Sequence, residues 1–116
     1  MPQPFRRLIG VLALLLAVGV STAAQRGHAA PTPAGAAIMI RNFAFVPQLL
    51  IIKPGTTVTW TNVDEDPHTA TAIAKAFRSP ALDTGSKFSF TFTKAGDYAY
   101  FCSLHPHMTG KVIVRS

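Results

Sequence analysis

The sequence predicts an all-β domain, a sandwich or barrel of short strands, and three observations lead to this prediction. From Ala36 onward, apolar residues alternate with polar ones at a period of two rather than 3.6. Turn-forming residues such as Gly, Pro and Asp separate the alternating segments at regular intervals. No segment has a convincing amphipathic helical pattern, and residues 72–76 allow one helical turn at most.

The first half of this region contains four predicted strands. The first strand carries Ile38 and Ile40 and extends to Phe43 or Phe45. In the strand predicted at Thr56–Asn62, apolar and polar residues alternate cleanly, which places Trp60 on the face that packs into the core. After the first strand, the predicted strands are Leu49–Ile52, Thr56–Asn62 and, more weakly, His68–Ala72.

The second half contains three further predicted strands. In the first of them Phe88, Phe90 and Phe92 alternate with polar residues, so we expect these three rings to face the core. A folded region of about 80 residues buries only a modest core, so a bound metal ion would add usefully to its stability. The predicted strands are Lys87–Thr93, Tyr98–Cys102 and Lys111–Arg115.

The N-terminus has the three parts of a secretory signal peptide. Arg6 and Arg7 make its start basic, residues 8–20 form an unbroken apolar run, and residues 21–24 are small. A membrane span needs about 20 apolar residues, and this run is shorter. We predict a signal peptide at residues 1–24, a flexible segment at 25–35 and a folded domain at 36–116. Cleavage after Ala30 instead of Ala24, or retention of the segment as a membrane anchor, stays open.

The charge distribution argues against one class of partner. The chain has a formal charge of +6, but residues 36–116 carry eight basic and five acidic side chains. No run of Lys and Arg with interleaved aromatic residues occurs, so nucleic acid is not an expected partner. Asp64, Glu65 and Asp66 form an acidic cluster, which is either a solvated loop or a docking patch for a basic partner.

Cys102 is the only cysteine, so the chain cannot form an intrachain disulfide. In an exported protein, an unpaired cysteine indicates a reactive thiol, an intermolecular disulfide or a metal ligand. Oxidising surroundings make an unprotected thiol a liability, and a bound metal ion would protect it.

Three metal-binding side chains follow one another at the end of the last predicted hairpin. Cys102 is followed three residues later by His105, and His105 three residues later by Met108. A loop that turns back between two strands can point all three at one centre, and His68 is a candidate fourth ligand. Two histidines, a cysteine and a weak methionine form the blue-copper arrangement; zinc also accepts Cys and His, but a thioether is unusual on zinc. We assign His105 as the ligand and His107 as an exposed neighbour whose role stays open.

Four segments are typical of one known family: Asn42–Phe45, Lys53–Asn62, Pro67–Thr69 and Tyr98–Met108. Through them the chain resembles the cupredoxin, or blue copper, family from about Ile38 to Arg115. The two residues between His105 and Met108 match the short ligand loop of amicyanin-like members, whereas plastocyanin-like members have a longer loop. Thr69 stands where the family often carries Asn, and we expect it to hydrogen-bond toward Ser103.

The resemblance implies a Greek-key sandwich of about seven to eight strands that holds one type 1 copper ion. The ligands would be His68, Cys102, His105 and Met108, and copper would cycle between Cu(I) and Cu(II). The family also implies a soluble, monomeric electron carrier in the periplasm, with a cytochrome c or a periplasmic dehydrogenase or reductase as redox partner. Electrons would enter and leave at the exposed edge of His105.

Two functions are consistent with a copper site, an electron carrier and a periplasmic module for copper storage, delivery or resistance. Delivery typically uses Met-rich or His-rich sequences, whereas only Met39 and Met108 remain after removal of residues 1–24. This composition favours the electron carrier. No general base, nucleophile or open coordination position is evident, so we do not expect an enzyme.

Overall fold

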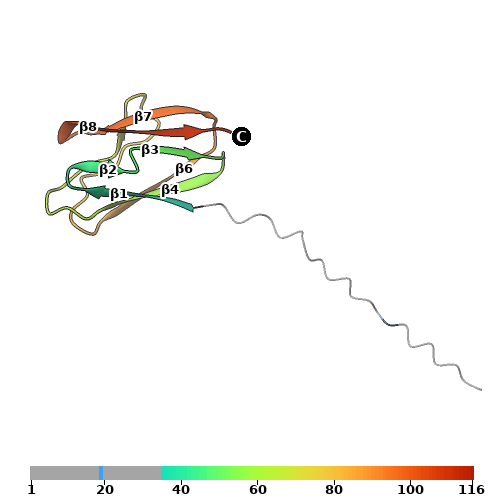
Figure 1. Cartoon of the computed structure of the whole chain (residues 1–116), viewed down its shortest axis with the longest axis horizontal. Helices are drawn as coiled ribbons and strands as arrows, with labels where there is room; N and C mark the ends of the chain where they lie inside the picture. Colours follow the sequence, from blue (N-terminus) through green and yellow to red (C-terminus); the bar gives the residue numbers. More distant parts are fainter. Residues whose placement is uncertain (1–18, 20–34) are drawn as a thin grey trace, which may run out of the picture. The chain divides into compact units, whose positions relative to one another are not determined.

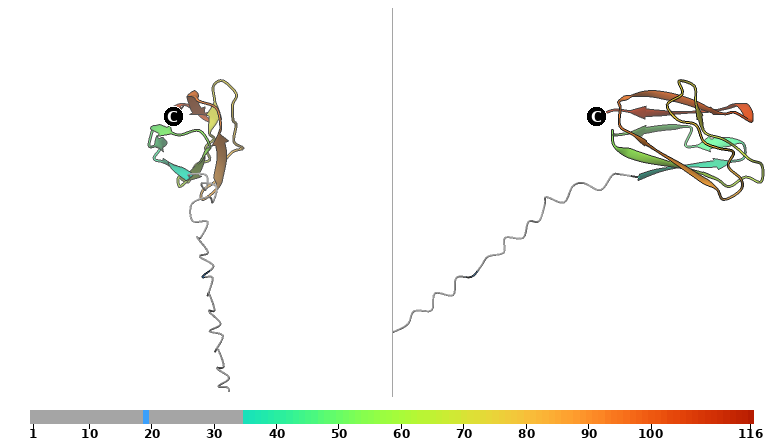
Figure 2. Two further views of the ribbon diagram at one scale, coloured as in Figure 1. Left: turned by 90° about the vertical axis from the view of Figure 1, so that its right-hand side faces the viewer. Right: turned by 180° about the vertical axis from the view of Figure 1, so that it is seen from behind.

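The computed structural model describes residue 19 and residues 35–116 (Figure 1). The predicted signal peptide and flexible segment, apart from Gly19 and Gly35, lie outside the described residues. Residues 35–116 form eight strands in two four-stranded sheets that face each other (Figures 1 and 2). This confirms the predicted all-β Greek-key sandwich. Across the described residues there is no helix that could span a membrane.

The first sheet contains β1 (Gly35–Arg41), β2 (Ala44–Val46), β4 (Thr56–Asn62) and β6 (Lys87–Phe92). Its strand order is β2-β1-β4-β6. The centre is a parallel pair in which Ile38 of β1 lies opposite Trp60 of β4. The outer strands run antiparallel to their neighbours, and β2 follows β1 through a two-residue turn.

The second sheet contains β3 (Leu49–Ile52), β5 (Thr71–Ala72), β7 (Gly96–Cys102) and β8 (His105–Val114). Its strand order is β3-β8-β7-β5. β3 runs parallel to β8, with Leu50 opposite Val112, while β7 runs antiparallel to both of its neighbours. From β2 to β7, consecutive strands therefore alternate between the two sheets, which closes the sandwich around a single core.

The core lies between the inner faces of the two sheets. Trp60 and Tyr100 are its largest fully buried side chains, and their rings meet edge to face with centroids 5.5 Å apart. Burial raises the pKa of Tyr100 to about 12. β8 brings Gly110 against the ring of Tyr100, and a Cβ at this position would collide with it. β8 therefore needs a glycine at position 110, directly opposite Tyr100 in its pairing with β7.

Two predictions for the first half of the domain need correction. Phe45 is the buried residue of β2, while Phe43 lies in the turn before it and is 46% exposed. The predicted strand at residues 68–72 is shorter than expected, because only Thr71–Ala72 pair with β7. The backbone of His68 pairs instead with Leu82, through N–O distances of 3.1 and 2.7 Å.

Two further differences concern the second half. Of the three alternating phenylalanines, Phe92 is fully buried, whereas Phe88 and Phe90 are only half-buried because β6 is an edge strand. The last strand begins at His105 rather than at Lys111. The sequence around His105 was predicted as a loop, but its backbone continues the hairpin with β7.

Candidate metal centre

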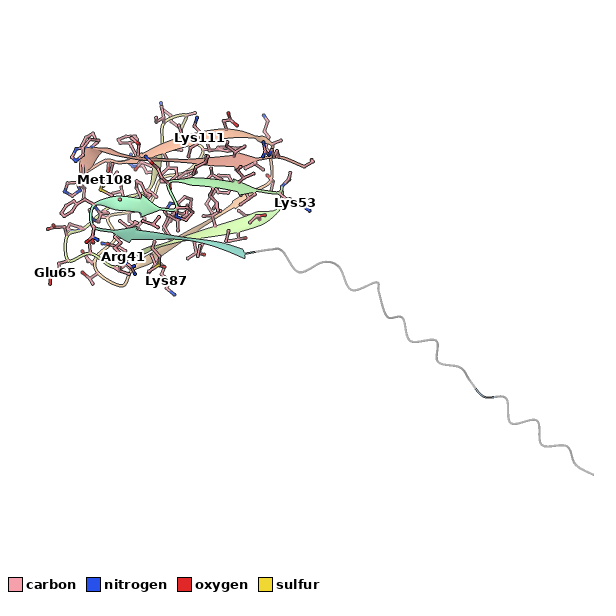
Figure 3. All side chains as sticks on the ribbon, viewed as in Figure 1. Arg41, Lys53, Glu65, Lys87, Met108 and Lys111 are labelled. Atoms are coloured by element: carbon pink, nitrogen blue, oxygen red, sulfur yellow. The ribbon has the colours of Figure 1, made fainter. Side chains whose placement is uncertain are left out.

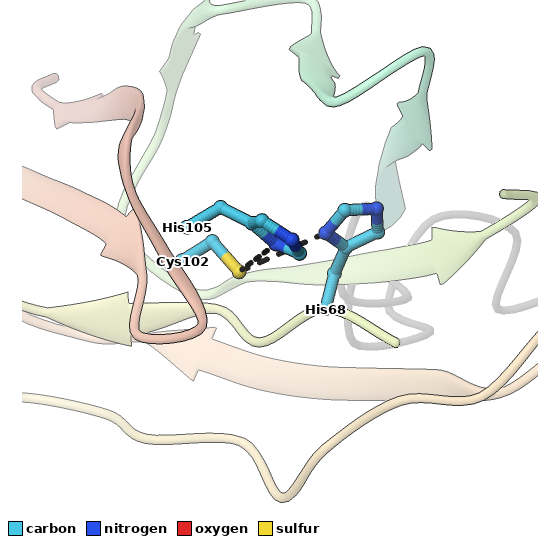
Figure 4. A group of neighbouring side chains, drawn as sticks. All are labelled: His68, Cys102 and His105. Carbon is cyan, nitrogen blue, oxygen red and sulfur yellow. Dashed lines mark hydrogen bonds between the residues drawn. The ribbon is translucent and has the colours of Figure 1, made fainter. Parts of the chain in front are cut away.

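Three predicted ligands converge at one end of the sandwich. The Cys102 Sγ lies 3.7 Å from the Nδ1 of His68 and 3.6 Å from the Nδ1 of His105 (Figure 4). All three donor atoms lie within 4.8 Å of one another. His68 and Cys102 are fully buried, while His105 is partly exposed. Soft and borderline donors are thus gathered at one point, with a single edge toward solvent.

The turn between β7 and β8 places the local part of this group. Cys102 ends β7 and pairs with His105 at the start of β8, but Phe101 pairs next with Thr109. Residues 106–108 are therefore extra residues that bulge out of the ladder. Met108 is the last of them and is buried, at 3% exposure. Figure 3 shows Met108 at the end of the sandwich opposite Lys53.

His68 comes from the long segment between β4 and β5, and one carboxylate fixes its ring. The Nε2 of His68 lies 2.9 Å from the Oδ2 of Asp64. With the proton held on Nε2 by this carboxylate, the lone pair of Nδ1 is available to a metal ion. This is the side-chain arrangement expected of a ligand whose orientation is set in advance.

Asp64 also holds the turn between β1 and β2. Its carboxylate accepts hydrogen bonds from the backbone N–H groups of Asn42, at 2.7 Å, and Phe43, at 2.9 Å. Burial alone would raise the pKa of Asp64, but the hydrogen bonds from Phe43, Asn42 and His68 outweigh it and keep this pKa below the usual 3.8. The carboxylate therefore stays ionised at neutral pH and joins the turn to the histidine.

Thr69 connects the segment that carries His68 to the turn that carries Cys102 and His105. Its backbone N–H donates to the Sγ of Cys102 at 3.3 Å. Its Oγ1 accepts from the backbone N–H of Ser103 at 2.8 Å and shares a hydrogen bond with the Ser103 hydroxyl at 2.9 Å. Thr71 adds a third hydroxyl, 3.0 Å from the Oγ1 of Thr69. The expected bond from Thr69 to Ser103 is therefore present in the structure.

Two residues at the site were not anticipated in these roles. Asp64 was expected only in a solvated loop or docking patch, and its four-residue spacing from His68 was the one signal of their contact. Phe43 was considered for a strand, but its ring contacts both histidines edge to face. His107 is exposed and, with Met108, lines a small hollow of about 170 Å³. The structure gives it no contact with the three converging donors.

The chemistry of these donors fits copper. Imidazole nitrogen suits copper and zinc alike, whereas a thiolate with a neighbouring thioether favours a soft ion such as Cu(I). The nearest carboxylate, Asp64, is directed to the far nitrogen of His68 and to backbone amides, so it does not offer the hard oxygen ligands of calcium or magnesium.

Comparison with known proteins agrees with this geometry. A family model described as a cupredoxin-like domain matches residues 10–114. The chain belongs to the cupredoxin family. This cupredoxin is 34% identical over 104 residues to amicyanin-alpha of Methylorubrum extorquens, covering 85% of this chain and 84% of that protein. It is 41% identical over 70 residues to amicyanin of Paracoccus denitrificans, covering 56% of this chain and about half (53%) of that relative.

Comparison with a solved structure also supports the cupredoxin fold. A purple cupredoxin from Nitrosopumilus maritimus superposes with a TM-score of 0.66 at 39% sequence identity, covering 69% of this chain and 99% of that one. The family and the donor set together identify the cofactor of this cupredoxin as one copper ion.

Proposed function

We propose that this cupredoxin is a type 1 copper protein that carries single electrons between redox partners. The observation that supports this most directly is the convergence of His68, Cys102 and His105, with donor atoms within 4.8 Å of one another. Met108, buried on the same turn, is proposed as the weak fourth ligand. When bound, copper supplies one-electron chemistry between Cu(I) and Cu(II).

The residues around the ligands favour fast electron transfer because they keep the site rigid. Asp64 holds His68, and the Thr69 backbone N–H holds the Cys102 sulfur. The ligand positions are then set by the fold and change little with oxidation state, which keeps the cost of rearrangement low. The N–H donated to the sulfur also stabilises negative charge there, so loss of this bond should shift the reduction potential.

His105 is the proposed route for electrons. Among the four proposed ligands, His68, Cys102 and Met108 are at most 3% exposed, whereas His105 is partly exposed. Leu104, on the same turn, is 48% exposed and offers an apolar surface beside it. A partner that docks over this end can approach the imidazole edge while water is excluded from the other ligands.

The proposed location is the periplasm, and the proposed partners are a cytochrome c or a periplasmic dehydrogenase or reductase. The basic and apolar composition of residues 1–24 supports export, and the relatives named amicyanin support a carrier rather than an enzyme. We propose that the carrier works as a monomer.

Addition of Cu(II) to the purified protein tests the proposal. We expect an intense blue charge-transfer band that disappears in Cys102→Ser and survives in His107→Ala, the matched control on the same turn. A missing band, or a band that persists in Cys102→Ser, would contradict a thiolate–copper site. Copper storage or a zinc site would then become the better hypothesis.

A further inference from the structure

The turn between β1 and β2 has an unfavourable residue at its tip. Arg41 pairs with Ala44, so the turn consists of Asn42 and Phe43. Both have left-handed backbones, with φ of 51° and 58°. Two-residue turns of this kind favour Asn followed by Gly, because glycine has no Cβ to strain a positive φ. A bulky phenylalanine in the glycine position is uncommon.

Burial in the core does not explain this phenylalanine. The ring of Phe43 is 46% exposed, whereas Phe45, two residues later, is 2% exposed and packs against Tyr100. A ring that stays half exposed and strains its own backbone calls for another explanation than core packing, and such strain is often found at functional sites.

The contacts of the Phe43 ring lie at the metal centre. Its centroid is 5.2 Å from the ring of His68 and 5.1 Å from that of His105, with interplanar angles of 90° and 88°. These are favourable edge-to-face arrangements. The half-exposed Phe43 ring therefore contacts both imidazoles, and the Asp64 carboxylate holds its backbone in place.

The two histidines differ in what else restrains them. His68 has Asp64 at its far nitrogen, as metal-ligating histidines usually require. Among the described residues, the imidazole of His105 has Cys102 Sγ as its only hydrogen-bond partner. Its remaining ring contacts are with Phe43 and, at 4.9 Å, His68.

We propose that Phe43 is a positioning residue that holds the His105 imidazole toward the copper ion, as Asp64 does for His68. The inference rests on the proposed function, since it assigns Phe43 to the same copper site. It explains why the turn keeps a strained phenylalanine, because glycine would relax the backbone but leave His105 without its aromatic contact. Stability of the turn and retention of copper should therefore respond in opposite directions to one substitution.

The variant Phe43→Gly tests this opposition. In the copper-free protein we expect a free energy of unfolding equal to or above that of the wild type, measured by urea denaturation. In the copper-loaded, ascorbate-reduced protein we expect at least a tenfold faster transfer of Cu(I) to the chelator bathocuproine disulfonate. Phe43→Tyr keeps the ring and should retain the wild-type rate. Val46→Ala is the matched control, because Val46 lies on β2 with a similar exposure of 49%.

Three results would overturn the proposal. They are an unchanged transfer rate in Phe43→Gly, a lower free energy of unfolding beside a faster rate, and an equal acceleration in Val46→Ala. The last two would indicate general loosening of the hairpin. Failure of the proposed function is separate, because it appears in the wild type as the absence of the blue band before any variant is made.

Discussion

The two halves of the copper site are built in different ways. The His68 half combines a buried ring with a carboxylate four residues away, Asp64, and it is tied to distant segments through Leu82 and through the β1–β2 turn that Asp64 holds. The half that contains Cys102 and His105 is assembled locally, on one turn between two paired strands, and reaches solvent. The comparison shows how one site combines a fixed anchor with an exposed contact edge. Such a division suits a carrier that must keep its ion and still meet its partners.

The largest difference between the halves should appear when each histidine is removed. His68→Ala leaves a sealed cavity and removes one of the hydrogen bonds to the Asp64 carboxylate, so we expect the copper-free protein to lose about 3 kcal/mol of unfolding free energy. His105→Ala removes a partly exposed ring and should cost less than about 1 kcal/mol. Urea denaturation measures both, and added imidazole should restore a blue band only in His105→Ala. Equal losses would show that the two halves are not built differently.

A second prediction concerns the pairing of β7 with β8, the two strands that carry Cys102 and His105. Gly110→Ala places a Cβ against the Tyr100 ring, so β8 or the ring must shift. We expect a loss of about 2 kcal/mol, typical of overpacking in a well-filled core. Thermal unfolding of the copper-free protein measures it. Gly55→Ala is a useful contrast, because a Cβ at Gly55 has open space and only the backbone strain of its positive φ remains.

The Asp64 carboxylate makes the stability of the folded protein around His68 depend on pH. Its pKa is lower in the folded protein than in the unfolded chain, so its contribution is complete above the usual 3.8 and is lost as pH falls through the folded value. Asp64→Asn should cost about 1 kcal/mol at neutral pH. Because the variant lacks this carboxylate, its stability should fall less steeply in acid. Acid unfolding of the copper-free wild type and Asp64→Asn, followed by the fluorescence of Trp60, measures this difference. If stability falls with pH equally steeply in both proteins, the prediction is wrong.

An effect of similar size tests the connection between the segment that carries His68 and the turn that carries Cys102 and His105. Thr69→Ala removes the hydroxyl that accepts from the Ser103 backbone, and we expect a loss of about 1 kcal/mol. Thr69→Ser keeps the hydroxyl and should stay close to the wild type. The backbone N–H to Cys102 Sγ remains in both variants, so the blue band should persist. A band lost in Thr69→Ala would mean that the hydroxyl matters for the ligand geometry and not only for stability.

The two halves also differ in how far the sequence alone predicts them. Cys102, His105 and Met108 are recognisable because their spacing is local, and alternation of apolar residues predicts most strands. Asp64 and Phe43 could not be assigned in the same way, since their contact spans 21 residues and depends on how the first hairpin folds over the site. The start of β8 at His105 was missed for a related reason. A bulge that absorbs residues 106–108 keeps the hairpin paired through a segment whose composition is typical of a loop.

The parallel pairing of β3 with β8 has a consequence for how the chain reaches its folded state. β3 lies early in the domain, yet its partners are the final strand residues, up to Val114. The second sheet therefore cannot gain β3 as its edge strand until residues 111–114 have been made, and pairing between segments so far apart in the sequence predicts slow folding.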